Sequence, residues 1–209
     1  MSSRQECMAS RGTPTSAAVM LRYEVSVFDT GAEAAAYLDV AIDGKTVGFG
    51  DSETMLTMGL YEKLAVHNEV HDPMHRPEGQ TFRQVACSTL LTDVFLTSLN
   101  AMAETGELVN IDGTGNRVAG SLFGHEKVYF VVSLKKLCPT LDDAVYRARN
   151  VAAPQNAARH GFANPCALKG DRCYDCSAKD RICNALVVHY RKMRGIEMEV
   201  VLIREALGL

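Results

Sequence analysis

The most chemically capable side chains lie at positions 100–117, between two apolar runs. The segment holds the carboxylates of Glu104 and Asp112 and the guanidinium group of Arg117. A loop carboxylate can serve as a base or a nucleophile, and arginine binds carboxylates and phosphates through paired hydrogen bonds. We expect Arg117 to hold an anion, Asp112 to orient it or to hold Arg117, and Glu104 to be catalytic. The amides expected to orient the ligand are Asn100, Asn110 and Asn116.

Two glycines of this segment, Gly113 and Gly115, favour close approach of the backbone to a ligand. Their spacing resembles the start of a dinucleotide fingerprint, but Val118 stands where the third glycine belongs, which disfavours that class. The alternative is structural, with Arg117 and Asp112 pairing to hold a tight turn.

A second candidate loop follows an earlier strand and leads into a helix whose predicted N-cap is Ser52. Free N–H groups at a helix N-terminus attract anions. Asp51 and Glu53, however, place negative charge where an anion would lie. A ligand with hydroxyls or a cation, carboxylates that point away, and a simple capped helix all remain open. The residues expected to bind a ligand here are Gly48, Gly50, Ser52 and Thr54.

Four of the seven cysteines lie in the segment 160–184. A C-x2-C pair with two further thiols six residues away on either side could complete a tetrahedral site, for zinc or for an iron–sulfur cluster. Nearby lysines and arginines would lower the pKa values of these thiols. Disulfides and free thiols are the alternatives. The expected metal ligands are Cys166, Cys173, Cys176 and Cys183.

Composition excludes several classes of protein. The net charge is −3, and no basic stripe indicates nucleic-acid binding. No apolar run is long enough to span a bilayer, so we expect a cytoplasmic protein without a membrane partner. The N-terminal residues are rich in Ser, Thr and Arg and lack the apolar segment of a secretory signal. Residues 1–20 are therefore predicted to form a disordered leader and not a signal peptide.

Strands and helices alternate along residues 21–209, which favours a single α/β domain with a mostly parallel sheet sandwiched by helices. Ligands in such folds bind beyond the carboxyl ends of the strands. A loop is expected over 66–79, and the last two strands are expected to close the domain as a hairpin. The expected strands span 21–28, 46–49, 94–98, 108–111, 127–133, 185–190 and 197–203. The expected helices span 32–42, 52–64, 80–91, 117–122 and 140–150, with Thr30, Ser52 and Thr140 as N-caps.

Residues 93–118 resemble the signature of the LUD (lactate utilisation) domain family. Segments 152–157, 180–184 and 205–208 are similar to stand-alone members of that family. The resemblance implies a fold related to ribose-phosphate isomerase, glucosamine-phosphate deaminase and the coenzyme A transferases. It also implies a bacterial or archaeal role in organic-acid (lactate-type) metabolism, with a small anionic metabolite as ligand.

The resemblance further implies chemistry at Glu104, which stands where the coenzyme A transferases carry a nucleophilic glutamate. Transferase-like and isomerase-like reactions are both open. Because LUD proteins occur beside iron–sulfur proteins, an iron–sulfur or oxidoreductase partner subunit is expected, and a homo-oligomer stays open. The alternative function is a non-catalytic accessory or electron-transfer protein that uses the four-cysteine site.

Overall fold

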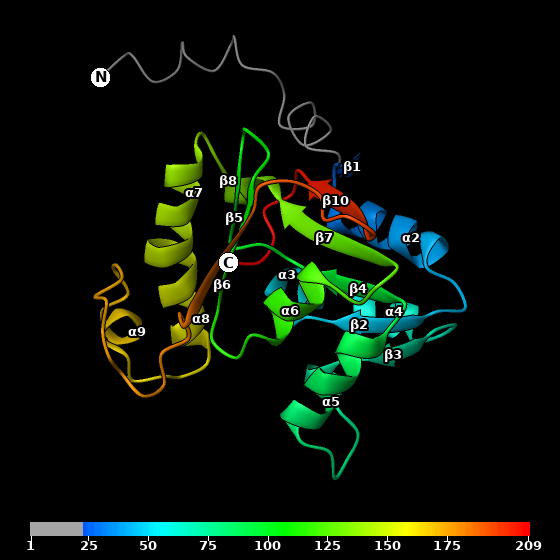
Figure 1. Cartoon of the computed structure of the whole chain (residues 1–209), viewed down its shortest axis with the longest axis horizontal. Coiled ribbons are helices and arrows are strands. Elements are labelled where there is room, and N and C mark those ends of the chain that lie inside the picture. Colours follow the sequence, from blue (N-terminus) through cyan, green and yellow to red (C-terminus); the bar gives the residue numbers. More distant parts are fainter. Residues whose placement is uncertain (1–22) are drawn as a thin grey trace.

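The computed structural model describes residues 23–209, and the predicted leader over 1–20 lies outside the described residues. The described part stacks helices, a large sheet, a small sheet and one long helix, in that order (Figure 1). The expected α/β class, with a mostly parallel sheet flanked by helices, is confirmed. The small sheet, which lies between the large sheet and the long helix, was not expected.

The large sheet has the order β1-β10-β7-β4-β2-β3, and every neighbouring pair is parallel. All of its carboxyl ends therefore lie at one edge, where ligands of such sheets bind. Its strands are β1 (Glu24–Phe28), β10 (Glu197–Ile203), β7 (Lys127–Ser133), β4 (Val94–Thr97), β2 (Thr46–Phe49) and β3 (Glu69–His71).

The central strands β10 and β7 are buried on both faces, which explains their nearly continuous apolar sequences. Along β10, Val201 and Ile203 pack with the helices on one face, whereas Val200 and Leu202 pack on the opposite face. Successive side chains of a strand point to opposite faces, so each face of the sheet receives its own half of the apolar residues.

The small sheet has the order β8-β5-β6-β9. Its strands are β8 (Leu137–Cys138), β5 (Ala101–Ala103), β6 (Leu108–Asp112) and β9 (Ala185–His189). The antiparallel hairpin β5–β6 packs Met102 and Leu108 against the large sheet and turns Ala101 and Val109 towards the long helix. This hairpin carries most of the polar segment singled out in the sequence.

The helices are α2 (Gly31–Ala41), α3 (Glu53–Thr57), α4 (Leu60–Leu64), α5 (Phe82–Ser88), α6 (Asn116–Leu122), α7 (Leu141–Arg147), α8 (Ala153–Arg159) and α9 (Pro165–Lys169). Short 3-10 turns are η2 (Pro73–His75), η3 (Thr89–Leu91) and η4 (Leu134–Lys136). The hydroxyls of Thr30, Ser52 and Thr140 accept hydrogen bonds at the first turns of α2, α3 and α7, which confirms the predicted caps. Within residues 23–209, no helix has the length and apolar character needed to cross a membrane.

The long helix consists of α7, the π-helical turn η5 (Ala148–Ala152) and α8. In η5 the N–H of Ala153 donates to the carbonyl of Ala148, five residues earlier. Pro154 follows directly and has no N–H for the regular helical bond, so the wider turn accommodates it. The helix continues to Arg159 and so places that side chain at the edge of the large sheet.

Three expectations about the elements are wrong. The predicted loop over 66–79 contains the edge strand β3, and the predicted helix over 52–64 breaks at Gly59, whose φ is +59°. The last two strands do not form a hairpin, because β9 pairs with β6 whereas β10 inserts between β1 and β7. β10 is apolar on both faces, and only the centre of a sheet can bury both.

Gly48 lies within β2, where the turn η3 packs closely against the strand. A Cβ at this position would lie 2.6 Å from the carbonyl oxygen of Thr89 and 2.7 Å from Oγ1 of Thr92. The packing of η3 therefore accounts for this glycine without a ligand.

We expect Gly48→Ala to lower the free energy of unfolding by about 3 kcal/mol, because the added methyl group collides with backbone. Gly44→Ala is the matched control. No atom lies within 4 Å of a Cβ there, so only the φ of +63° should cost stability, by about 1 kcal/mol. Urea unfolding measures both variants, and equal losses would contradict the packing explanation.

Candidate functional site

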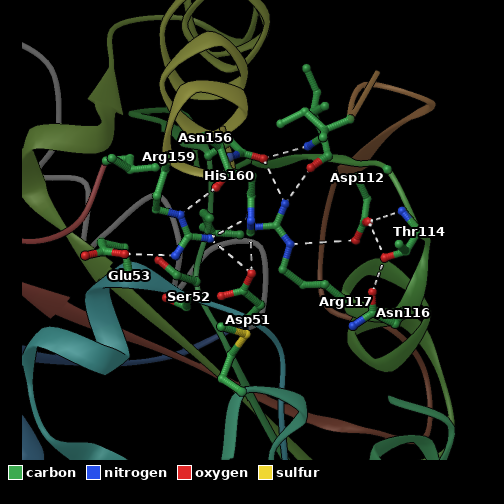
Figure 2. A pocket seen from close by; sticks show the side chains of 18 of the residues that line it. Asp51, Ser52, Glu53, Asp112, Thr114, Asn116, Arg117, Asn156, Arg159 and His160 are labelled. Carbon is green, nitrogen blue, oxygen red and sulfur yellow. Dashed lines mark hydrogen bonds and ion pairs between the residues drawn. The ribbon is translucent and has the colours of Figure 1, made fainter. Parts of the chain in front are cut away.

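A cavity of about 420 Å³ opens at the carboxyl edge of the large sheet. Its lining residues follow four parallel strands. Asp51 to Glu53 follow β2, Ser98 to Asn100 follow β4, Lys136 follows β7 and Leu209 follows β10. The rest of the wall comes from the end of β6, the start of α6 and the end of α8 (Figure 2), from the segment after β3 (Met74, Arg76 and Phe82), and from Phe162 and Ile182. The cavity thus lies where ligands of parallel α/β sheets bind.

One wall is a tight turn built around the buried carboxylate of Asp112. Its Oδ1 accepts hydrogen bonds from the N–H groups of Thr114 (3.0 Å) and Gly115 (2.9 Å). Its Oδ2 accepts from the N–H of Val118 (3.2 Å) and lies 3.7 Å from Nε of Arg117. The carboxylate thus satisfies free N–H groups at the start of α6, and only a long ion pair remains for the guanidinium group.

Arg117 reaches across this turn into the cavity (Figure 2). Its Nη2 donates to Oδ1 of Asn100 (3.2 Å) and to the carbonyl of Ile111. Burial lowers the pKa of Arg117, an effect that the carboxylate of Asp112 opposes. Gly50 leaves room for the side chain, since a Cβ there would lie 3.0 Å from Cγ of Arg117.

Two amides hold the chain beside Arg117. Oδ1 of Asn100 accepts from the N–H of Ile111 (2.7 Å) as well as from Arg117. Oδ1 of Asn110 accepts from the N–H of Asn100 (3.1 Å), and its Nδ2 donates to the carbonyl of Ser98 (3.4 Å). Asn110 is fully buried and does not line the cavity, so these bonds tie β6 to the end of β4.

The opposite wall carries Arg159, which pairs with both carboxylates of the acidic loop after β2 (Figure 2). Its Nη1 lies 2.9 Å from Oε2 of Glu53, and its Nη2 lies 3.0 Å from Oδ2 of Asp51. Its Nε donates to Oδ1 of Asn156 (3.1 Å), and His160 lies 3.6 Å from Asp51. Both carboxylates of this loop therefore bind a cation from the protein itself.

Lys136 lies at the floor of the cavity and is only 4% exposed. Its Nζ donates to Oγ1 of Thr54 and to Oγ of Ser98, both at 3.1 Å. Burial, together with the positive charges of Arg147, Arg117 and Lys135, lowers the pKa of Lys136 to about 7. Within residues 23–209 the ammonium group forms no ion pair with a carboxylate, so near neutral pH much of it is uncharged.

The ionisable groups of the lining are unequally paired. Three carboxylates and four basic side chains line the cavity, besides His160. Arg159 takes two of the carboxylates, whereas Arg117 shares the third with the backbone of α6. The guanidinium charge of Arg117 is therefore less compensated than that of Arg159, and a ligand anion would complete it.

The structure brings some of the predicted site residues together and separates others. Those that line the cavity are Ser52, Asn100, Asp112, Gly113, Asn116 and Arg117. Those that do not line it are Gly48, Gly50, Thr54, Glu104, Asn110 and Gly115. Thr54 contributes indirectly, because its hydroxyl binds Lys136. Gly113 makes room for the protein as well as for a ligand, since a Cβ there would lie 2.9 Å from Cα of Ile182.

Glu104 lies in the turn between β5 and β6, away from the cavity lining. Its N–H donates to the carbonyl of Cys138 (2.8 Å). The turn is closed by a hydrogen bond from the N–H of Gly106 to the carbonyl of Ala103 (2.9 Å). The structure therefore does not bring Glu104 together with Arg117, although both belong to the same polar segment. The hairpin points its turn away from the end at which Asn100 and Asp112 meet.

The predicted four-cysteine metal site is not supported. Within residues 23–209, no group of three or more His, Cys, Asp or Glu side chains is placed to hold a metal ion. Cys183 packs against the core of the small sheet, and Sγ of Cys173 accepts a hydrogen bond from the N–H of Asp175. Arg181 holds the segment together by donating to the carbonyls of Cys176 (2.7 Å) and Cys183 (3.0 Å).

The expected lowering of the thiol pKa values also fails at Cys166. Burial and the neighbouring thiol of Cys176 raise the pKa of Cys166. The segment instead docks on the glycine turn of the site, where Asn184 donates to the carbonyls of Asp112 (3.0 Å) and Gly113 (2.9 Å). We therefore assign this segment a supporting contact with the cavity wall.

The sequence did not predict four polar residues of the cavity lining, which are Lys136, Asn156, Arg159 and His160. Lys136 carried a usable signal, because it comes three residues after the most apolar predicted strand, where site residues of parallel sheets occur. Arg159, Asn156 and His160 carried none, since they approach the sheet only through the course of the long helix.

The fold and the cavity define an α/β protein with a polar cavity at the carboxyl edge of a parallel sheet. The model of the family described as LUD domain matches residues 17–203. The chain therefore belongs to the LUD domain family, which is linked to lactate utilisation.

A crystal structure of a DUF162 family protein from Deinococcus radiodurans is similar to this chain, with a TM-score of 0.51 and 12% sequence identity. The match covers 91% of this chain and 93% of that chain. At this identity the likeness shows a shared fold alone. A comparison with curated proteins gives no match.

Removing Arg159 should leave two adjacent carboxylates without their cation. We expect Arg159→Met to lower the free energy of unfolding by about 2 kcal/mol. Adding Asp51→Asn should recover about 1 kcal/mol of that loss, because one repelling charge disappears. Urea unfolding of the single and double variants measures the coupling, and strictly additive losses would argue against the pairing.

Lys136 should make stability depend on pH with a defined sign. Its pKa is lower in the folded chain than in the unfolded chain, so its cost is complete below pH 7 and fades as the pH rises towards 10. Lys136→Met should therefore be more stable than the wild type at pH 6. That advantage should shrink by up to about 1.4 kcal/mol per pH unit between pH 7 and 10.

Urea unfolding at several pH values tests this expectation, with Lys135→Met as the matched control. Lys135 is exposed, does not line the cavity and is the weakest of the three positive charges that act on Lys136, so its replacement should leave most of the pH dependence in place. An identical pH profile for the wild type and Lys136→Met would contradict the effect of burial.

Proposed function

We propose that the cavity binds a small carboxylate metabolite of organic-acid metabolism. The observation that carries the proposal is the partly compensated guanidinium group of Arg117, which faces the cavity and has one carboxylate at 3.7 Å. Arginine binds a carboxylate in a planar, two-pronged arrangement, and burial strengthens such a bond because water competes less. Membership of a family linked to lactate utilisation supports the same class of ligand.

The other polar groups suit an oxygen substituent next to the carboxylate. Lys136, Ser98 and Asn100 line the same cavity as Arg117. A hydroxyl or carbonyl oxygen on the neighbouring carbon of the ligand would meet the amine of Lys136. The proposal therefore favours 2-hydroxy and 2-oxo acids over simple fatty acids.

The size of the cavity also favours a small ligand. Its volume of about 420 Å³ lies at the low end of the range for small-molecule sites. A compact metabolite fits this space, and the loop after β2 contributes the hydroxyl of Ser52 while its carboxylates stay paired with Arg159.

The proposal assigns no chemistry to Glu104, which lies outside the cavity. It also assigns no electron transfer to the cysteine segment, because the thiols are not arranged as a metal site within residues 23–209. A cytoplasmic setting, an oxidoreductase partner and self-association stay predictions from the sequence.

Isothermal titration calorimetry with L-lactate, pyruvate and the neutral amides of both acids tests the carboxylate requirement. We expect both acids to bind and both amides to bind at least about tenfold more weakly, since the amide cannot pair with Arg117. A matching rise in melting temperature should follow, because a ligand of the folded state alone stabilises it. Equal affinities for acids and amides would refute an anion site.

Two lysine variants localise the binding. Lys136→Met should weaken the binding of both acids by about tenfold, the effect of one lost polar contact. Lys135→Met serves as the control and should keep the wild-type affinity, because Lys135 lies outside the lining. Loss of binding in both variants would show that general surface charge, and not the cavity, attracts the acids.

A further inference from the structure

The amine of Lys136 differs from the guanidinium groups of Arg117 and Arg159 in its partners. Arg117 and Arg159 both pair with carboxylates, whereas Lys136 binds only the hydroxyls of Thr54 and Ser98. Retaining a buried lysine without a carboxylate costs stability, and such costs are typical of functional positions.

The surroundings of this amine favour its uncharged, nucleophilic form. The side chain is 4% exposed, and the positive charges of Arg147 and Arg117 act on it. Removal from water beside other cations is an established way to activate lysine towards carbonyl carbon. A neutral amine that donates to two hydroxyls also directs its lone pair away from both.

The position of the amine fits a ligand anchored by its carboxylate. Lys136 and Arg117 line one cavity, and the positive charge of Arg117 helps to lower the pKa of Lys136. In a 2-oxo acid the carbonyl carbon is bonded directly to the carboxylate carbon. An acid held by Arg117 would therefore present its carbonyl group inside the cavity that Lys136 also lines.

Building on the proposed carboxylate site, we propose that Lys136 forms an imine with the carbonyl carbon of a bound 2-oxo acid. The nitrogen attacks the carbonyl carbon, and a carbon–nitrogen bond forms. The carbonyl oxygen then leaves as water, carrying the two hydrogens that the amine gives up. No oxidant, reductant or metal is needed for this step, and 2-hydroxy acids cannot undergo it.

Reductive trapping of the full-length protein tests the proposal. The protein is incubated with pyruvate and sodium cyanoborohydride, and its mass and peptide map are then measured. We expect a single adduct with the mass of pyruvic acid less one oxygen. It should occur on Lys136 at a level at least about tenfold above any other lysine. L-lactate, which has no carbonyl carbon at position 2, should give none.

Variants and a separate binding measurement define the outcomes. Lys136→Met should lose the adduct, and Lys135→Met should keep it at the wild-type level. An adduct spread over exposed lysines, or one retained in Lys136→Met, overturns the proposal. Pyruvate that binds in calorimetry but is never trapped overturns the imine while the carboxylate site stands. Failure of both acids to bind ends the carboxylate site itself.

Discussion

Burial of both faces of the central strands β7 and β10 is the constraint on which the rest of the structure depends. Water is excluded from both sides, so most side chains in the middle of the sheet are apolar, and a buried charge such as that of Glu199 needs a partner, here Lys127. Because the strands are parallel, the loops after β2, β4, β7 and β10 meet at one edge. The cavity therefore lies where a rigid apolar body ends and the backbone turns.

The ionisable side chains at this edge differ in how far a partner within the protein compensates their charge. Asp51 and Glu53 share Arg159, so the negative charge of the acidic loop is partly compensated within the protein. The carboxylate of Asp112 accepts hydrogen bonds mainly from the N–H groups at the start of α6, so Arg117 has a single long ion pair. Lys136 has no carboxylate partner within residues 23–209, and burial lowers its pKa. The poorly compensated charges of Arg117 and Lys136 lower the stability of the folded chain and lie where a ligand would bind. Such a loss of stability is common in binding and catalytic sites.

The polar segment at 100–117 illustrates how one stretch of sequence serves several purposes. Asn110 ties two strands together, Asp112 caps a helix, and Arg117 faces the cavity, although the three residues look alike as candidates in the sequence. The antiparallel hairpin separates them further, because its turn carries Glu104 away from the end that forms the site. The cysteine segment behaves similarly. It docks on the glycine turn through Asn184, and its thiols do not converge.

The sequence by itself determined the α/β class, the apolar strands, the helix caps and part of the cavity lining, because these depend on local periodicity and on which residue follows a strand. Lys127–Ser133 was predicted with its observed bounds, and the cap at Ser52 was predicted as well. Only the tertiary structure decided that β10 inserts beside β7, that Arg159 pairs with both carboxylates of the loop after β2, and that Lys136 faces the cavity. These features arise from contacts between residues that are tens of positions apart. Burial and charge compensation are properties of the assembled neighbourhood, which no local pattern in the chain encodes.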